Sequence, residues 1–348
     1  MTALVGCLGG GQLGRMLALA GAPLGVGMRF LDPAADACAG QVGELIVGAY
    51  DDPACLERLA DGADAVTYEF ENVPVDAARS VGAVPDPRAL ELGQDRLVEK
   101  QLFRRLEIAT VPFGSIEEVG VPALVKSRRL GYDGKGQRVV ESQEAVDDDE
   151  LAEGIVRFRR ELSIEAVRGA TGETAFYPLA ENEHRGGILA VSRAPAPDAP
   201  QREAEEIAER LLDELGYVGV LAVELFDVGG ELLANEFAPR VHNTGHWTID
   251  GAETSQFENH LRAILGLPLR PMIARGPSVM VNLFGATPAL ERLQSIPGAH
   301  VHLYGKEPRP GRKLGHVTLV DASEGAVDEV VALAREAWTV YAGELSLG

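Results

Sequence analysis

The sequence predicts an α/β protein with a parallel, doubly wound sheet in its N-terminal part and a small β-rich region in its C-terminal part. Three observations carry this prediction. Over the first 90 residues, short apolar runs alternate with helical segments, and such alternation is typical of parallel sheets with helices on both faces. A strand–turn–strand pattern follows at residues 220–237, and short apolar runs recur after Pro268.

The composition is that of an ordinary globular protein, and it excludes several classes of function. The chain has 348 residues, of which 46% are hydrophobic and 24% charged, and this length predicts roughly two to three domains. A net charge of −21 argues against a nucleic-acid partner, because binding through overall charge requires a basic face. The three cysteines, Cys7, Cys38 and Cys55, lack CxxC spacing, so we expect buried free thiols.

The sequence does not predict a membrane protein or an exported one. No stretch approaches the roughly 18 consecutive apolar residues that a membrane span needs. Residues 1–5 lead straight into a glycine-rich turn, without the basic start and long apolar region of a signal peptide. We therefore expect a cytoplasmic protein.

The N-terminal elements alternate in the order of a nucleotide-binding domain. We expect strands at residues 3–8, 27–31, 45–50 and 65–70, and helices at residues 12–20 and 53–60. The turn Gly9–Gly14, with the pattern G-x-G-x-x-G, lies between the first strand and the first helix, and Asp32 ends the second strand. This is the fingerprint of a Rossmann-like dinucleotide-binding domain. Taken alone, it predicts an NAD-dependent oxidoreductase.

Lysine is scarce, and each lysine lies in a segment with a distinct pattern. The chain has 5 lysines against 27 arginines, although lysine is normally among the commonest residues. Lys126 ends an apolar run typical of a strand, and the loop Gly131–Gln137, with three glycines and Lys135, follows it. Glycine-rich loops of this kind bind anions with backbone N–H groups. The segment Lys306–Lys313 holds four cations in eight residues, so we expect a second anion there.

Helices and short strands account for much of the remaining chain. A helix that begins at residue 96 places Arg96, Lys100 and Arg104 on one face. Another helix has apolar side chains at residues 204, 207, 208, 211, 212 and 215 and ends at Gly216. Strands expected at residues 278–283, 300–304 and 316–320 form the predicted β-rich region.

Two glutamates on the predicted hairpin suggest a metal site. If three residues centred on Gly230 form its loop, Glu224 and Glu236 lie directly opposite each other on one face. Two facing carboxylates repel, and a hard cation between them would explain their coexistence, as in sites where Mg²⁺ is held by carboxylates and substrate phosphates. The alternative, in which one glutamate faces solvent on an edge strand, stays open.

At this level of detail the chain resembles the ATP-grasp enzymes, and within them the 5-(carboxyamino)imidazole ribonucleotide synthase family. The motifs that carry the resemblance follow the family's order along essentially the whole chain. They are Gly10–Met16, Glu69–Asn72, Asp95–Arg96 with Lys100–Phe103, Gly131–Gln137, Phe176–Leu179, Gly216–Val220, Asn235–Asn243, Gly245–Trp247, Ser255–Phe257, and Arg309–Lys313 with Gly315–His316. Each motif is weak alone, whereas the ordered set is specific.

The resemblance implies an ATP-grasp architecture with an N-terminal Rossmann-like domain and a small C-terminal β-rich domain. It divides the chain into residues 1–94, 95–267 and 268–348, with a lid subdomain at about 112–155 inside the second domain. It also implies a homodimer.

The resemblance further implies which residues bind ATP. Lys126 would lie near the nucleotide, Glu161 would take the ribose hydroxyls, and the loop Gly131–Gln137 would close over the phosphates. The complete implied set is Arg96, Lys126, Gly131, Tyr132, Asp133, Gly134, Lys135, Gly136, Gln137, Glu153, Gly154, Ile155, Val156, Glu161, His184, Asn235 and Glu236. Glu224 and Glu236 would hold Mg²⁺, the implied cofactor.

A second implied set of residues would bind 5-aminoimidazole ribonucleotide. This set is Gln12, Leu13, Glu71, Tyr132, Asp133, Gln137, Lys306, Arg312 and Lys313, the last three on the 5′-phosphate. In the implied reaction, bicarbonate attacks the γ-phosphate of ATP to form carboxyphosphate and ADP, and the amine of the ribonucleotide then attacks the activated carboxyl carbon or CO₂ released beside it. Arg240, His242 and Lys135 would be the catalytic residues. The reaction belongs to de novo purine (IMP) biosynthesis.

Three alternatives remain beside this interpretation. An NAD-dependent oxidoreductase would leave Glu224, Glu236 and the basic segment Arg309–Lys313 unexplained. A binding protein without catalytic activity would leave all five lysines unexplained. Formate-dependent glycinamide ribonucleotide transformylase shares the architecture, but the loop Gly131–Gln137 and the segment Val241–Trp247 resemble the carboxylating family more closely.

Overall fold

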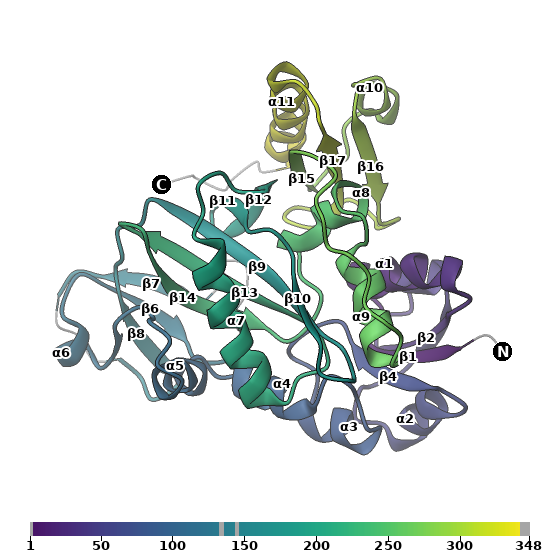
Figure 1. Ribbon diagram of the computed structural model, residues 1–348, viewed down its shortest axis with the longest axis horizontal. Helices are drawn as coiled ribbons and strands as arrows, with labels where there is room; N and C mark the ends of the chain where they lie inside the picture. Colours follow the sequence, from purple (N-terminus) through teal and green to yellow (C-terminus); the bar gives the residue numbers. More distant parts are fainter. Residues whose placement is uncertain (1–2, 132–135, 143–145, 342–348) are drawn as a thin grey trace.

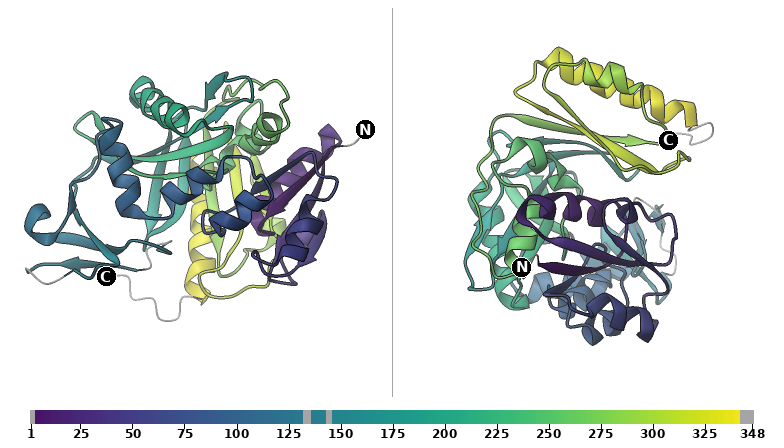
Figure 2. Two further views of the ribbon diagram at one scale, coloured as in Figure 1. Left: turned by 90° about the horizontal axis from the view of Figure 1, so that it is seen from below. Right: turned by 90° about the vertical axis from the view of Figure 1, so that its right-hand side faces the viewer.

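The computed structural model describes residues 3–131, 136–142 and 146–341, with side chains as far as residue 337. Within these residues the chain forms a four-stranded parallel sheet, a nine-stranded antiparallel sheet and a smaller four-stranded sheet (Figure 1). The nine-stranded sheet lies between the other two, as the views in Figure 2 also show. The α/β class expected from the sequence is confirmed.

The N-terminal sheet has the strand order β3-β2-β1-β4, and all of its neighbours are parallel. Helices cover both of its faces (Figure 2). Its elements are β1 Leu4–Leu8, α1 Gln12–Gly21, η1 Ala22–Leu24, β2 Gly27–Asp32, η2 Cys38–Gln41, β3 Glu44–Val47, α2 Pro53–Ala60, β4 Ala65–Tyr68, α3 Val75–Ser80 and α4 Pro87–Gly93. The expected order is confirmed, although β3 and β4 end earlier than expected because residues 48–50 and 69–70 already belong to the loops at the edge of the sheet.

The large sheet runs in the order β14-β13-β9-β11-β12-β15-β17-β16, with β10 paired to β9. Its strands are β9 Arg160–Arg168, β10 Thr174–Phe176, β11 Ala180–Arg185, β12 Ile188–Ala194, β13 Gly219–Val228, β14 Glu231–Ala238, β15 Ser278–Phe284, β16 Ala299–Leu303 and β17 Lys313–Val320. The C-terminal region is β-rich as expected. Its strands extend this sheet through the pairing of β12 with β15, in which Val191 faces Val281.

The smaller sheet has the order β5-β8-β6-β7 and encloses a core of its own around Ala123, Val125 and Ala152. Its elements are β5 Phe113–Gly114, α6 Ile116–Val119, β6 Ala123–Ser127, β7 Gln137–Val140 and β8 Glu150–Gly154. It projects from one end of the molecule, at the left of Figure 1. It therefore stands beside β14 as a separate layer.

The remaining helices pack on the large sheet or join its strands. They are α5 Arg96–Arg105, α7 Gln201–Leu215, η3 Thr244–Trp247, α8 Thr248–Gly251, α9 Gln256–Ile264, α10 Leu290–Gln294 and α11 Glu324–Tyr341. The apolar stripe predicted for α7 is buried against β9 and β13, and the helix ends at Gly216 with φ of +54°. Only glycine adopts this left-handed conformation without strain.

The hairpin of β13 and β14 brings Glu224 opposite Glu236, but its loop differs from the prediction. The loop is the two residues Gly229 and Gly230, both with positive φ, so that Val228 pairs with Glu231. Such two-residue turns fit the twist of paired strands. A β-bulge at Asn235 then shifts the register by one residue, which restores the pairing of Glu224 with Glu236.

One further expectation, on the cysteines, is confirmed. Cys7, Cys38 and Cys55 are buried free thiols. No helix in the described part of the chain has both the length and the apolar character to cross a membrane.

Candidate active site

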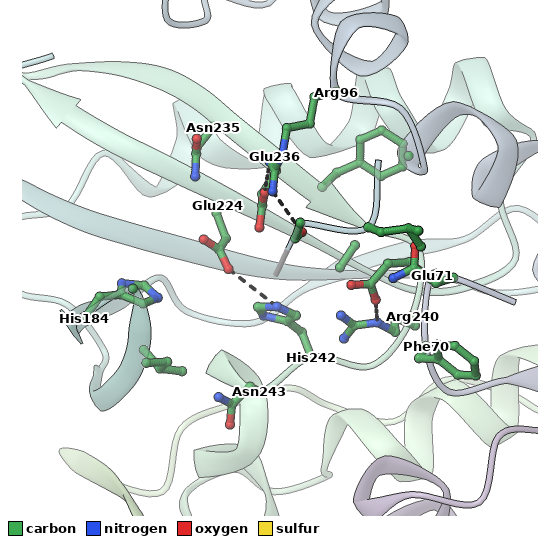
Figure 3. A pocket seen from close by; sticks show the side chains of 18 of the residues that line it. Phe70, Glu71, Arg96, His184, Glu224, Asn235, Glu236, Arg240, His242 and Asn243 are labelled. Atoms are coloured by element: carbon green, nitrogen blue, oxygen red, sulfur yellow. Dashed lines mark hydrogen bonds and ion pairs between the residues drawn. The ribbon is translucent and has the colours of Figure 1, made fainter. Parts of the chain in front are cut away.

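A single pocket of about 830 Å³ gathers most of the predicted site residues. The large and small sheets line it together with the start of helix α1 and the loop after β4 of the N-terminal domain, and Figure 3 shows the part around the hairpin. The predicted residues on its wall are Gln12, Leu13, Glu71, Arg96, Lys126, Gly131, Gly136, Gln137, Glu161, His184, Glu224, Asn235, Glu236, Arg240, His242, Lys306 and Lys313. The two anion-binding segments expected from the sequence thus open into one cavity.

The other predicted residues fall into two groups. Tyr132, Asp133, Gly134 and Lys135 lie outside the described residues. The described residues that do not line the pocket are Glu153, Gly154, Ile155, Val156 and Arg312. Arg312 lies at its rim, beside the pocket residues Gly311 and Lys313, with Nη2 3.8 Å from a carboxylate oxygen of Asp36.

The carboxyl groups of Glu224 and Glu236 have different partners (Figure 3). Glu236 Oε2 lies 2.7 Å from Arg96 Nη1, and Glu224 Oε1 lies 3.5 Å from His242 Nε2. Burial favours the neutral form of both, but Arg96 outweighs burial at Glu236 and lowers its pKa to about 2. Burial and the neighbouring Glu236 raise the pKa of Glu224 to about 7. The pair therefore lacks a full complement of positive charge.

The oxygen donors at this pair fit a hard divalent cation. The side-chain oxygen of Asn235, the extra residue of the bulge, is buried and has no hydrogen-bond partner among the described residues. No cluster of three or more His, Cys, Asp or Glu side chains in the described chain forms a metal site by itself. Mg²⁺ commonly takes one or two carboxylates and completes its shell with substrate phosphates and water, so this set suits Mg²⁺ bound together with a nucleotide.

Helix α5 presents its basic face to the second strand of the hairpin. Arg96 bonds Glu236, and its second nitrogen, Nη2, donates to the carbonyl oxygen of Gly131 over 3.1 Å. Lys100 is only 1% exposed and donates to the carbonyl oxygen of Asn235. The helix thereby ties the bulge and the start of the glycine-rich loop to one wall of the pocket.

Glu153 joins two lysines below this wall. Its Oε2 lies 2.6 Å from Lys126 Nζ, and its Oε1 lies 3.6 Å from Lys100 Nζ. Both lysines lower the pKa of Glu153 against the opposing effect of burial. The carboxylate of Glu153 is therefore held by lysines, and neither Glu153 nor Gly154 lines the pocket.

The outer part of the pocket combines a polar pair with two aromatic rings. His184 and Glu161, on neighbouring strands, form a hydrogen bond that raises the pKa of His184 although burial opposes it. The rings of Phe158 and Phe226 stack with centroids 4.7 Å apart. The sequence analysis missed both rings. Phe226 could have been found, because it follows Glu224 by two residues on a strand and therefore shares its face.

The segment after β14 is fixed at both its side chains and its backbone. Arg240 forms an ion pair with Glu71 of the N-terminal domain, which lowers the pKa of Glu71 against burial (Figure 3). The backbone N–H of His242 donates to Gln256 Oε1 over 2.9 Å, and Gln256 Nε2 donates back to the carbonyl oxygen of His242 over 2.5 Å. Gly245 permits this clamp, because a Cβ there would lie 2.7 Å from Gln256 Nε2.

The glycine-rich turn of the N-terminal domain already holds an anion, which is Glu69 of the same chain. Its carboxylate accepts hydrogen bonds from Gly11 N over 2.5 Å and from Gly14 N over 2.6 Å. Added Cβ atoms at Gly9 and Gly11 would lie 2.4 and 2.5 Å from the Glu69 side chain, which explains the glycine pattern. Asp32 accepts from Gly10 N over 2.8 Å. The dinucleotide interpretation is therefore not favoured. The sequence analysis named Glu69 in a motif but did not predict its contact with the turn, because only the fold brings it there.

Two backbone N–H groups of the same turn remain available. Within the described residues no hydrogen bond satisfies the N–H of Gln12 or Leu13, at the start of helix α1. Lys306 donates to the side-chain oxygen of Gln12, and Lys313 Nζ lies 5.8 Å from the ring centroid of Phe284. Free N–H groups at a helix start beside two lysines suit a phosphate.

Three family models match successive parts of the chain. The ribonucleotide synthetase preATP-grasp domain matches residues 1–94, and the ATP-grasp domain matches residues 113–257. The phosphoribosylaminoimidazole carboxylase C-terminal domain matches residues 278–330.

Whole-chain relatives agree with these models. The N5-carboxyaminoimidazole ribonucleotide synthase of Pseudomonas aeruginosa is 47% identical, over 94% of this chain and 97% of its own. The crystal structure of N5-carboxyaminoimidazole ribonucleotide synthetase from Thermus thermophilus has a TM-score of 0.89 and 52% identity, over 99% of this chain and 100% of that chain. The synthase from Aspergillus clavatus, solved with ADP and 5-aminoimidazole ribonucleotide, has a TM-score of 0.88 and 30% identity, over 96% and 99% of the two chains. The chain belongs to the N5-carboxyaminoimidazole ribonucleotide synthase family of ATP-grasp proteins.

Proposed function

We propose that the pocket catalyses the ATP- and bicarbonate-dependent carboxylation of the amine of 5-aminoimidazole ribonucleotide, a step of de novo purine biosynthesis. The observation that carries this proposal is the pair Glu224 and Glu236, which lies between a basic ATP-grasp wall and a basic ribonucleotide end of one pocket. The names and bound ligands of the relatives agree with it.

ATP is proposed to lie between the large sheet and the small sheet. The stacked rings of Phe158 and Phe226 offer an apolar surface to the base, and Glu161 with His184 offers hydrogen bonds to the ribose. Arg96 and Lys126 supply positive charge to the phosphates. The small sheet, with the loop Gly131–Gln137, is proposed to be the lid of a domain at residues 95–267, between domains at residues 1–94 and 268–348.

Glu224, Glu236 and Asn235 are proposed to hold Mg²⁺ together with ATP. The ion would neutralise charge that develops on the phosphoryl oxygens. The raised pKa of Glu224, caused by burial and by Glu236, agrees with a site that awaits a cation.

The ribonucleotide is proposed to place its 5′-phosphate at the start of helix α1. There the N–H groups of Gln12 and Leu13 would donate to it, while Lys306, Lys313 and Arg312 supply charge. Glu71 lies between this end and the hairpin through its ion pair with Arg240. This position would orient the base of the ribonucleotide toward the γ-phosphate of ATP.

The chemistry is proposed to consist of two displacements. An oxygen of bicarbonate attacks the γ-phosphorus of ATP, the bond to ADP breaks, and carboxyphosphate forms. The amine nitrogen then attacks the carboxyl carbon, phosphate leaves, and the amine gives up a proton. Arg240 would bind the carboxyphosphate, and His242 Nε2 would take the proton, since burial and Arg240 hold the pKa of His242 far below its usual value and keep the ring neutral. Lys135 would assist from the loop.

An assay of ADP release tests this proposal. We expect release to require Mg²⁺ and to rise strongly with 5-aminoimidazole ribonucleotide plus bicarbonate, while glycinamide ribonucleotide plus formate gives only background. Equal turnover with the second pair would assign the chain to the transformylase. NADH binding without ATP hydrolysis would exclude both ligases. We further propose a cytoplasmic homodimer, as in the family that the sequence resembles, which light scattering of the purified protein would test.

A further inference from the structure

A chain of hydrogen bonds leads from His242 into the interior, away from the pocket. His242 Nδ1 lies 2.7 Å from the hydroxyl oxygen of Thr244, and that hydroxyl donates to Glu165 Oε1 over 2.6 Å. On the opposite side of the ring, His242 Nε2 faces Glu224 in the pocket. The side chains of Thr244 and Glu165 are both fully buried, with 0% exposure.

Glu165 is an unusual residue for its position in the fold. It lies in the middle of β9, where it pairs with Ala222 of β13, and its neighbours Ile164 and Ala166 belong to the apolar core. Its second oxygen, Oε2, has no hydrogen-bond partner among the described residues. A buried carboxyl group with one hydrogen bond costs stability, and burial raises the pKa of Glu165 to about 7. The fold is thus less stable for having the Glu165 carboxyl group buried behind His242.

We propose that Glu165 and Thr244 are positioning residues that fix the tautomer of His242. This inference rests on the proposed role of His242 as a proton acceptor. A threonine hydroxyl has one proton, and when it donates to the Glu165 carboxylate its oxygen can only accept from the imidazole. Nδ1 must then carry the ring proton, and Nε2 presents its lone pair to the pocket.

Without these hydrogen bonds, the ring of His242 would be free to adopt the opposite tautomer. A neutral imidazole with its proton on Nε2 would donate to Glu224 Oε1, which lies 3.5 Å away. That contact would occupy both the proton acceptor and a proposed cation ligand. The charged and titratable groups that also act on His242 are Glu224, Glu236, Arg240, Lys313 and His184. None of these contacts Nδ1 in the described structure, where both neighbours of that nitrogen belong to Thr244. The backbone N–H of Thr244 points at Nδ1 over 3.4 Å, longer than an ordinary hydrogen bond, whereas the hydroxyl oxygen lies at 2.7 Å, so the hydroxyl sets the proton on that nitrogen.

Substitutions at Thr244 provide the first test. Thr244→Val keeps the shape but removes the hydroxyl, so we expect kcat to fall by about tenfold or more, the low end of what a general base contributes. The KM for ATP should stay within about twofold, because the change lies behind His242 and not at the nucleotide. Thr244→Ser restores the hydroxyl and should recover most of kcat. Thr318→Val is the matched control, because Thr318 is equally buried and its hydroxyl has no partner in the described chain.

The tautomer itself provides the second test. With histidine labelled by ¹⁵N, the ring of His242, assigned by its loss in His242→Asn, should show Nδ1–H and an unprotonated Nε2 at about pH 8, where Glu165 is ionised. Thr244→Val and Glu165→Leu should both shift the ring toward Nε2–H. Unchanged nitrogen shifts in both variants would overturn the inference. Equal loss of kcat in Thr244→Val and Thr244→Ser would do so as well, because it would indicate packing alone.

His242→Asn separates this inference from the proposed function. If that variant turns over like the parent protein, His242 is not a proton acceptor and the proposed mechanism is wrong. If it loses activity while Thr244→Val retains the parent kcat, the mechanism stands and only the positioning role is wrong. Thermal unfolding of each variant separates these outcomes from a failure to fold.

Discussion

Buried carboxylates occur both in the N-terminal sheet domain and in the large sheet, but the two regions compensate their charge differently. Glu69 satisfies both of its oxygens with the N–H groups of Gly11 and Gly14, which belong to a rigid turn. In the large sheet, the partners among the described residues are a neutral histidine for Glu224 and a hydroxyl for Glu165. The Glu69 carboxylate is compensated without a ligand, whereas the carboxyl groups of Glu224 and Glu165 are not.

The difference shows how a glycine fingerprint and a carboxylate pair should be interpreted. The N–H groups of Gly11 and Gly14, which a side chain of the same protein takes, cannot also bind a pyrophosphate. A buried carboxyl group whose charge its surroundings do not compensate indicates a site that binds a cation or another ligand. In this protein, the glycines of the fingerprint therefore hold Glu69, only the N–H groups of Gln12 and Leu13 remain for a ligand, and the hairpin is the proposed reactive region.

The largest effect is expected at the hairpin. Glu236→Gln keeps the volume but removes one of two charges that face the proposed cation, so turnover should fall by about a hundredfold or more. Steady-state ADP release at saturating Mg²⁺ measures this. Glu231→Gln, at an exposed position on the same strand, should behave like the parent protein. Turnover near that of the parent in Glu236→Gln would show that Glu236 is no ligand.

The next largest effect is expected at Glu165 in the interior of β9, where the stability of the fold depends on pH. Burial raises the pKa of Glu165 to about 7 from 4.5, so the folded protein binds this proton more tightly than the unfolded chain. Ionisation then destabilises the fold, and the parent protein should lose up to ~3 kcal/mol of stability as pH rises from 4.5 to about 7. Glu165→Gln should lack this loss.

The measurement is the difference in unfolding free energy between Glu165→Gln and the parent protein across this pH range. We expect the variant to gain relative to the parent as pH rises, and the difference to level off above about pH 7. Glu209→Gln, on the exposed face of α7, should give a difference that does not vary with pH. A flat difference for Glu165→Gln would mean that its carboxyl is not destabilised by burial.

Features that depend on local sequence could be predicted, and features that depend on distant contacts could not. The pairing of Glu224 with Glu236 followed from strand alternation, although the assumed three-residue loop was wrong and the bulge at Asn235 compensated for it. A bulge leaves no clear mark in the sequence, because it adjusts the register to the rest of the sheet.

The contact of Glu69 with the glycine-rich turn and that of Glu165 with Thr244 could not be predicted from the sequence, for the same reason. Glu69 is 58 residues away from Gly11, and Glu165 is 79 residues away from Thr244. The extension of the large sheet by β15 also depends on a distant pairing, between residues 191–194 and 278–281. The roles assigned to individual ATP and ribonucleotide residues stay predictions, and Lys135 lies outside the described residues.

A smaller effect is expected at the glycine-rich turn. Glu69→Gln replaces one acceptor oxygen by an amide group, so either Gly11 N or Gly14 N loses its bond. Hydrogen bonds to charged groups contribute about 1.5–3 kcal/mol, and a loss of ~2 kcal/mol should lower the Tm by several degrees. Glu57→Gln, at an exposed position of α2 in the same domain, is the control. An unchanged Tm would show that Glu69 is not required to complete the turn.

The smallest effects are expected from two lysine substitutions, one at each end of the pocket. Lys126 lies on β6 beside Glu153, and Lys313 begins β17 beside Phe284. If Lys126 binds ATP and Lys313 binds the ribonucleotide phosphate, Lys126→Met should weaken only the binding of ATP. Lys313→Met should weaken only the binding of the ribonucleotide, and its Kd should rise by about tenfold if one charge-assisted contact is lost. Calorimetric titration of each variant with both ligands measures this.

Arg309→Met distinguishes a specific phosphate contact from the general charge of the basic segment. Arg309 belongs to the same segment as Lys313 but is exposed and does not line the pocket. A long-range field would make the two substitutions equivalent and would weaken in about 1 M salt, where charges are screened beyond about 3 Å. A direct contact would make Lys313→Met the more severe change and preserve most of its effect in salt. If Lys313→Met binds the ribonucleotide as the parent protein does, the phosphate is not at this end of the pocket, and the N–H groups of Gln12 and Leu13 serve another purpose.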